Sequence, residues 1–246
     1  MSTILLPPER ADFIIRETHA FLRTEFRHGH DFLKPPFIVE FFGNPDSGKS
    51  SAIKSAYTNL RRHGFHIKKP LEGAEEISDD IPRSSPEFNV ATGVYVVNLL
   101  MHLHHLHKHD VVIFDRGIFD AYGQMARWNK KGKLSDEETR MYQSFFTSQY
   151  FAPRMTLGIA MICDPDVAMA RDQKSSRTKL VGESTNPDAI NSMRDATIQT
   201  YEELRGRFPL ALIDTSHLSL EEVADTVQAL LLEKFLETAR ASTKRA

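Results

Sequence analysis

The fold of this chain is decided by the stretch Phe37-Ile38-Val39-Glu40-Phe41-Phe42-Gly43-Asn44-Pro45-Asp46-Ser47-Gly48-Lys49-Ser50-Ser51. An apolar run rich in β-branched and aromatic residues ends at Gly43, and a helix-forming segment begins after the motif, from Ala52 onward. The intervening spacing, G-x-x-x-x-G-K-S, is that of a loop that binds nucleotide phosphates. Its glycines let backbone N–H groups surround a polyphosphate, and the N-terminus of the following helix adds partial positive charge. The stretch therefore predicts a nucleoside triphosphate site.

The side chains of this loop have predicted roles of their own. The ammonium group of Lys49 can reach the β- and γ-phosphates, and the hydroxyl of Ser50 can ligate the Mg²⁺ that bridges them. The predicted nucleotide-binding residues of the loop are Gly43, Asn44, Pro45, Asp46, Ser47, Gly48, Lys49, Ser50 and Ser51.

The composition is that of one α/β domain with a sizeable core. The chain has 246 residues, of which 41% are hydrophobic and 26% charged. A net charge of −2 gives no global basic field, so nucleic-acid binding is not expected. Cys163 is the only cysteine, which excludes an intrachain disulfide and a cysteine-cluster metal site. We find neither a signal-peptide pattern nor an apolar run of the ~20 residues that a membrane span requires, so a cytoplasmic location is expected.

The order of the expected elements predicts the architecture. Strands are expected at 37–43, 65–68, 111–114, 155–163 and 210–213, and helices lie between them. This alternation predicts a five-stranded parallel sheet with helices on both faces, occupying residues 37–240. Residues 1–36 are expected to form an N-terminal helical extension, which either packs on the flank of the domain or acts as a partner-binding arm.

Polar residues follow the expected strands at the edge where ligands bind in such sheets. Asp115 and Arg116 end the third strand. Asp115 suits the outer shell of a Mg²⁺ site, and Arg116 suits a phosphate, although such a pair can also merely cap a strand end. The segment Asp214-Thr215-Ser216 follows the fifth strand.

A basic segment follows the fourth strand and a short helix. It contains Arg171, Lys174, Arg177 and Lys179 in a run without apolar anchors, and we interpret residues 171–186 as a lid over the phosphates, with Arg171 and Arg177 as catalytic candidates. The alternative is a solvated surface loop.

Histidines are concentrated in residues 102–109, and His105 and His109 have the i, i+4 spacing of a metal pair. The run enters the third strand at its amino end, on the opposite edge from the phosphate site, and histidines suit a helix C-terminus. A structural role is therefore favoured over a metal site.

With these motifs in place, residues 37–235 resemble the deoxynucleoside kinase and thymidylate kinase branch of P-loop kinases. The resemblance rests on the phosphate loop, on Val112-Ile-Phe-Asp-Arg-Gly117 and on Asp164-Pro165 followed by Arg171. It implies ATP as phosphate donor, Mg²⁺ as cofactor and a nucleoside or nucleoside monophosphate as small-molecule acceptor. It also implies that Asp214, Thr215 and Ser216 line the adenine of ATP. The family's catalytic base follows the second strand, where Glu72 is the nearest match.

The chain departs from the family pattern in the acceptor half. Asp46 stands where the family usually has glycine, and Asn98 and Asp120 are only approximate matches to the residues that recognise the base. Two alternatives therefore remain open: a nucleotide-binding regulatory switch, and a kinase of another small hydroxyl-bearing metabolite. Whether the chain forms a homodimer is also open.

Overall fold

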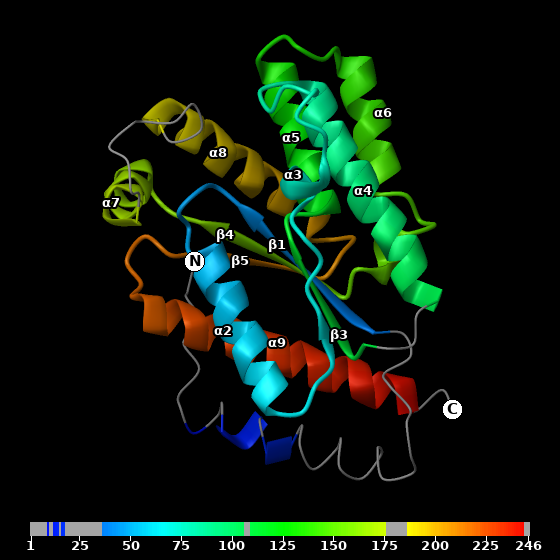
Figure 1. The fold of residues 1–246 in the computed structure, drawn as a ribbon, viewed down its shortest axis with the longest axis vertical. Helices are drawn as coiled ribbons and strands as arrows, with labels where there is room; N and C mark the ends of the chain where they lie inside the picture. Colours follow the sequence, from blue (N-terminus) through cyan, green and yellow to red (C-terminus); the bar gives the residue numbers. More distant parts are fainter. Residues whose placement is uncertain are drawn as a thin grey trace.

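The computed structural model describes residues 9, 12–14, 16–17, 36–105, 109–175 and 186–243. Its centre is a five-stranded parallel sheet in the order β2-β3-β1-β4-β5, which confirms the expected architecture (Figure 1). The strands are β1 (Phe37–Gly43), β2 (Ile67–Lys68), β3 (Val111–Asp115), β4 (Leu157–Ile162) and β5 (Leu210–Asp214). Because β1 lies between β3 and β4, the phosphate loop is adjacent to the carboxyl ends of both strands.

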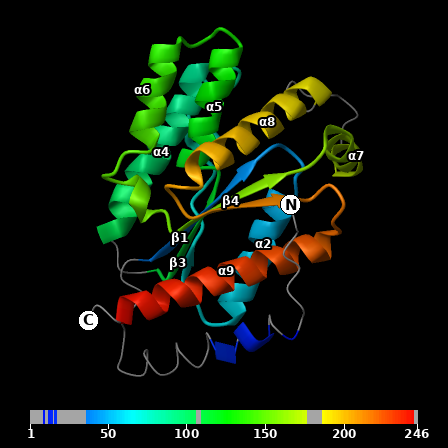
Figure 2. The ribbon, with the colours of Figure 1, turned by 180° about the vertical axis from the view of Figure 1, so that it is seen from behind.

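Helices cover both faces of the sheet (Figures 1 and 2). One face carries α2 (Lys49–Arg62) and α9 (Leu220–Thr243). The other carries α4 (Pro86–His105), α5 (Ile118–Lys130) and α8 (Pro187–Leu204), with α6 (Asp136–Phe146) packed against α5. The shorter elements are α3 (Gly73–Glu76), η2 (Ala152–Arg154) and α7 (Pro165–Ser175).

The sequence of β1 explains why the strand is central. Phe37, Val39 and Phe41 pack in the cluster beneath α2 and α9, whereas Ile38 and Phe42 pack in the cluster beneath α4 and α5. A strand covered on both faces needs apolar residues at successive positions rather than at alternate ones. The one ionisable residue in β1 is Glu40, which is fully buried.

Two helices, α6 and α9, begin with capping boxes. The N–H of Glu138 donates to the hydroxyl of Ser135 at 3.2 Å, and the carboxylate of Glu138 accepts the N–H of Ser135 at 2.8 Å. Ser219 and Glu222 make the same pair of contacts at the start of α9. Each box provides partners for backbone N–H groups that the helix itself leaves unpaired.

Some element boundaries differ from those expected. Helix α2 begins at Lys49, inside the motif, and the acidic loop after β2 contains the short helix α3. Helix α7 continues to Ser175, so Arg171 and Lys174 are helical rather than part of a loop. The rest of the predicted lid, with Arg177 and Lys179, lies outside the described residues except for its last residue.

Most of the N-terminal extension also lies outside the described residues. Within the described part, Ile14 is buried in the cluster under α2 and α9, and Glu17 lies 3.3 Å from Arg240 of α9. These contacts place the described residues of the extension on the flank of the domain; its boundary remains a prediction.

Two further expectations concern metals and membranes. In the part of the chain that the structure describes, no three His, Cys, Asp or Glu side chains cluster as a metal site, but the side chain of His105 is outside that part. Among the same residues, no helix is long and apolar enough to span a bilayer.

Candidate active site at the phosphate loop

The backbone of the phosphate loop depends on two glycines. Gly43 has φ 139°, and a Cβ atom there would overlap the carbonyl oxygen of Met161 on β4. Gly48 has φ 90° and precedes α2 without providing a side-chain cap. No acidic residue lies in the first turn of α2, so the N–H groups and the partial positive charge of this helix end are available to an anion.

The side chain of Asn44 holds the loop against the end of β4. Its Nδ2 donates to the carbonyl of Cys163 at 3.2 Å, and its Oδ1 accepts the N–H of Cys163 at 3.1 Å. Asn44 is fully buried, and its side chain positions the loop.

Arg171 and Thr215 also hold the phosphate loop in place through hydrogen bonds. The guanidinium of Arg171 donates to the carbonyl of Asp46 at 3.1 Å and to the carbonyl of Thr215 at 2.7 Å. The hydroxyl of Thr215, which is fully buried, lies 3.0 Å from the carbonyl of Ser47. Both side chains therefore join the phosphate loop to the segment after β5. A contact of Arg171 with a transferring phosphate remains a prediction.

The other residues predicted around the nucleotide lie at the accessible side of the loop. Ser50, Ser51 and Asp214 are exposed, whereas Pro45, Asp46 and Ser216 are half-buried. The carboxylate of Asp214 accepts the hydroxyl and N–H of Ser216, which orders the turn predicted to line adenine.

Lys49 is enclosed by its own loop. Its Nζ donates to the carbonyl of Asn44 at 2.6 Å and lies 3.3 Å from the hydroxyl of Ser47. Burial and the nearby Arg116 lower the pKa of Lys49 to about 8. An anion in the loop would restore a high pKa, because it provides the opposite charge that this buried ammonium lacks.

The end of β3 brings together one arginine and three carboxylates. Asp115 is in register with Phe41 of β1, which places it beside the phosphate loop. The Nε of Arg116 lies 3.1 Å from Glu72, and its Nη1 lies 2.9 Å from Asp120. Asp120 and Glu72 raise the pKa of this guanidinium, whereas burial raises the pKa of the Glu72 carboxyl above its usual value. The structure thus brings Glu72 to the site although its sequence match is imperfect.

Glu40 is a site residue that the sequence reasoning missed. Its two carboxylate oxygens accept the N–H groups of Phe119 at 3.1 Å and Asp120 at 2.8 Å, at the start of α5. The carboxylate occupies the space beside Gly117, where a Cβ atom would come within 2.6 Å of it. Glu40 therefore fixes the turn that carries Arg116. The available signal was a carboxylate inside an otherwise apolar strand.

We expect Glu40→Ala to destabilise the protein by about 2–5 kcal/mol, because the buried N–H of Phe119 and the partly buried N–H of Asp120 lose their acceptors. A buried N–H group left without an acceptor costs about 1–3 kcal/mol. Burial raises the pKa of Glu40 to about 8. The folded state therefore binds more protons than the unfolded state between about pH 4.5 and 8, and the free energy of unfolding should fall as pH rises through this window. Urea unfolding across that range measures both effects. Glu40→Gln should make the pH slope less steep, with the part due to Glu72 and Asp46 remaining; an unchanged slope would contradict the assignment.

Asp46 places a carboxylate and a left-handed non-glycine backbone in the phosphate loop, both of which a glycine would avoid. It has φ 55°, in the left-handed region, and burial and Asp172 raise the pKa of its carboxyl. We expect Asp46→Gly to bind ATP about tenfold more tightly, because it removes negative charge beside the phosphates. Asp46→Asn isolates the effect of the charge, since asparagine tolerates the same backbone conformation and also lacks the charge. Calorimetric titration should show a gain for both variants; no gain for either would place the carboxylate away from the nucleotide.

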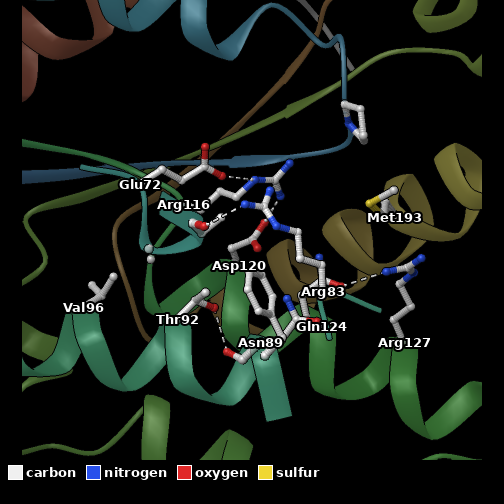
Figure 3. Close-up of a pocket in the computed structure, with 15 residues that line it drawn as sticks. Glu72, Arg83, Asn89, Thr92, Val96, Arg116, Asp120, Gln124, Arg127 and Met193 are labelled. Carbon is white, nitrogen blue, oxygen red and sulfur yellow. Dashed lines mark hydrogen bonds and ion pairs between the residues drawn. The ribbon is translucent and has the colours of Figure 1, made fainter. Parts of the chain in front are cut away.

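A pocket of about 240 Å³ opens beside the phosphate loop (Figure 3). It lies between α3, α4, α5 and α8, and Pro45 of the loop forms part of its wall. Its other principal lining residues are Glu72, Arg83, Asn89, Thr92, Val96, Arg116, Asp120, Gln124, Arg127 and Met193. Figure 3 shows Arg116 between Glu72 and Asp120 at one end of the pocket, and Arg127 turned toward Gln124 at the other.

Comparisons with known proteins bear on the fold. No protein-family model and no curated sequence matches the chain. Solved structures of deoxyadenosine kinase from M. mycoides do match. The structure with dCMP and dCDP is 18% identical with a TM-score of 0.56, and the alignment covers 82% of this chain and 99% of that one. The structures with dCTP and dATP are 16% and 17% identical, with TM-scores of 0.55 and 0.57. They align with 80% and 79% of this chain, and with 100% and 99% of their own.

At these identities the likeness concerns the fold. In this chain the parallel sheet has the order β2-β3-β1-β4-β5, and the phosphate loop lies between β1 and α2. The chain therefore shares the fold of these deoxyadenosine kinase structures.

Proposed function

We propose that this protein is an ATP-dependent phosphotransferase that phosphorylates a nucleoside or a nucleoside monophosphate. One observation carries the proposal: a pocket large enough for a small organic molecule opens directly beside the phosphate loop, with a carboxylate and an arginine at their junction. A nucleotide-binding regulatory switch does not require a second pocket beside its nucleotide site. The deoxyadenosine kinase fold supports the same conclusion.

The phosphate loop is proposed to bind the donor. The N-terminus of α2 and the ammonium of Lys49 face the polyphosphate, and Lys49 exchanges its contact with the Asn44 carbonyl for a phosphate oxygen. The exposed hydroxyl of Ser50 and the carboxylate of Asp115 are oxygen donors of the kind that suits Mg²⁺. When bound there, the ion neutralises charge on the transferring phosphoryl group.

Glu72 is proposed to act as the base at the acceptor. When the acceptor is a nucleoside, Glu72 accepts the proton of its hydroxyl as that oxygen attacks the γ-phosphorus of ATP, and the bond to the β-phosphate oxygen breaks to release ADP. A raised pKa suits this role, because it brings the basicity of Glu72 closer to neutral pH. Arg116 holds Glu72 and Asp120 and directs its remaining N–H groups at the pocket, where they neutralise developing charge. Arg171 and Arg177 belong to the proposed lid.

The test is a panel of nucleosides, nucleoside monophosphates and other hydroxyl-bearing metabolites, assayed for ADP release against an acceptor-free control. We expect release to depend on the acceptor and on Mg²⁺. Acceptor-independent release that no panel member accelerates would identify a hydrolase or switch instead.

A further inference from the structure

The two ends of the pocket differ in hydrogen-bonding character. Glu72 and Asp120 provide acceptors near the phosphate loop. Gln124 lies one helical turn beyond Asp120 on α5, about 6 Å farther along the axis. Asn89 of α4 is bonded to Trp128, which places it at the level of the third turn of α5. We call Asn89, Gln124 and Arg127 the distal end of the pocket.

The amide of Asn89 has a fixed orientation. Its Oδ1 accepts the indole N–H of Trp128 at 2.7 Å. An indole nitrogen only donates, so the amide cannot be reversed without losing this bond. Among the described residues no acceptor binds the Nδ2 of Asn89, and both its N–H groups are available to a ligand.

The amide of Gln124 is fixed in the same way. Gln124 is 8% exposed, and its Oε1 accepts a guanidinium N–H of Arg127 at 3.1 Å. A guanidinium also only donates, so the Nε2 of Gln124 is left without a partner in the described structure. The Nε of Arg127 is itself buried and unpaired there. Each amide oxygen at the distal end thus already accepts one N–H, and the side-chain atoms there that lack any partner among the described residues are donors.

We propose that the acceptor carries an oxo base, whose carbonyl oxygens bind at the distal end, rather than a base with an exocyclic amino group. This inference rests on the proposed function. A carbonyl oxygen provides the acceptor that the amide and guanidinium N–H groups lack. An exocyclic amino group would instead face these N–H groups, which would remain without an acceptor once the ligand excludes water from the pocket.

The solved structures with this fold sharpen the contrast. The M. mycoides deoxyadenosine kinase structures contain dATP, dCTP or dCMP, all of which have amino bases. Fold likeness alone would therefore favour an amino base for this chain, whereas the fixed amides of Asn89 and Gln124 favour the opposite class.

The test compares nucleosides that differ chiefly in one exocyclic group: deoxyuridine with deoxycytidine, and deoxyinosine with deoxyadenosine. We expect the oxo member of at least one pair to have a kcat/KM higher by about tenfold or more. Binding of each nucleoside is measured in parallel by calorimetry without ATP. Equal or better use of the amino members would overturn the inference and leave the proposed function intact.

The decisive variant is Gln124→Glu. Its carboxylate keeps one oxygen on Arg127 and presents the other to the base, so the distal end gains an acceptor. We expect the oxo-to-amino ratio of kcat/KM to fall by about tenfold or more. Gln228→Glu on α9 is the matched control, because Gln228 also accepts a side-chain N–H, from Asn59 at 2.8 Å, but lies outside the pocket. A ratio that is unchanged in folded Gln124→Glu would refute the assignment.

The same panel distinguishes a failure of the proposed function from a failure of the inference about the base. If oxo nucleosides bind selectively but neither they nor their monophosphates are phosphorylated, the proposed function fails, and only the assignment of the distal end to a base carbonyl stands. If no nucleoside binds, the inference fails, whereas phosphorylation of a nucleoside monophosphate would still support the proposed function.

Discussion

Lys49→Met should lower kcat for phosphoryl transfer by about two to three orders of magnitude, the effect typical of removing one charge that stabilises the transition state. Methionine is the appropriate replacement because Lys49 is only 7% exposed, and a shorter side chain would leave a cavity in the loop. The remaining contacts of the loop, through Asn44 and Thr215, should hold its backbone in place.

The measurement is steady-state turnover with saturating ATP and acceptor, alongside thermal unfolding. Lys54→Met, at an exposed position of α2, is the matched control and should retain activity. The pH dependence provides a second readout. Because the pKa of Lys49 is lowered to about 8 in the free protein, ATP affinity should fall as pH rises through 8. This dependence should be absent in Lys49→Met. Near-native turnover by a folded Lys49→Met protein would refute the phosphate-loop assignment.

Glu72→Gln should lower kcat/KM for the acceptor by about two to four orders of magnitude, the range for loss of a positioned general base. Glutamine is close to glutamate in size and can accept an N–H from Arg116, so the geometry at the end of β3 should survive. ATP affinity should change little, because the contacts of the loop with phosphate do not involve Glu72.

The matched control is Glu75→Gln, an exposed residue of α3 that does not line the pocket. The acidic limb of the pH–rate profile should lie above pH 4.5, since burial raises the pKa of Glu72, and this limb should disappear in the variant. Wild-type activity in Glu72→Gln would assign the base elsewhere, with Asp120 as the next carboxylate of the pocket.

Much of the fold could be predicted because it is encoded locally. The continuous apolar runs of β1, β3 and β4 indicated buried parallel strands, and the glycine spacing of the phosphate loop indicated a strand-to-helix turn. Polar residues that follow parallel strands gather at one edge of the sheet, and the pairing of β1 with β3 places Asp115 beside the loop. The capping boxes at the starts of α6 and α9 are local features of the same kind.

The rest depends on contacts between residues far apart in the chain. Glu40 and Asp120 are separated by 80 residues, and Arg171 and Asp46 by 125, so no local pattern indicates either contact. The segment of Arg171 has the composition of a lid, but the folded chain directs this side chain at backbone carbonyls. The arrangement of hydrogen-bond donors and acceptors in the pocket is also not visible in the sequence. It depends on which atom of Asn89 faces Trp128, and only a folded structure fixes that.

The central claim is that the phosphate of ATP passes to a molecule held in the pocket. The most direct measurement is to incubate the protein with Mg²⁺, γ-labelled ATP and a mixture of nucleosides and nucleoside monophosphates, and to separate the products. We predict that the label appears in a phosphorylated nucleoside or nucleotide, and that Glu72→Gln forms a phosphorylated nucleoside about two to four orders of magnitude more slowly. Label found solely as inorganic phosphate, in equal amounts with and without the mixture, would contradict the account.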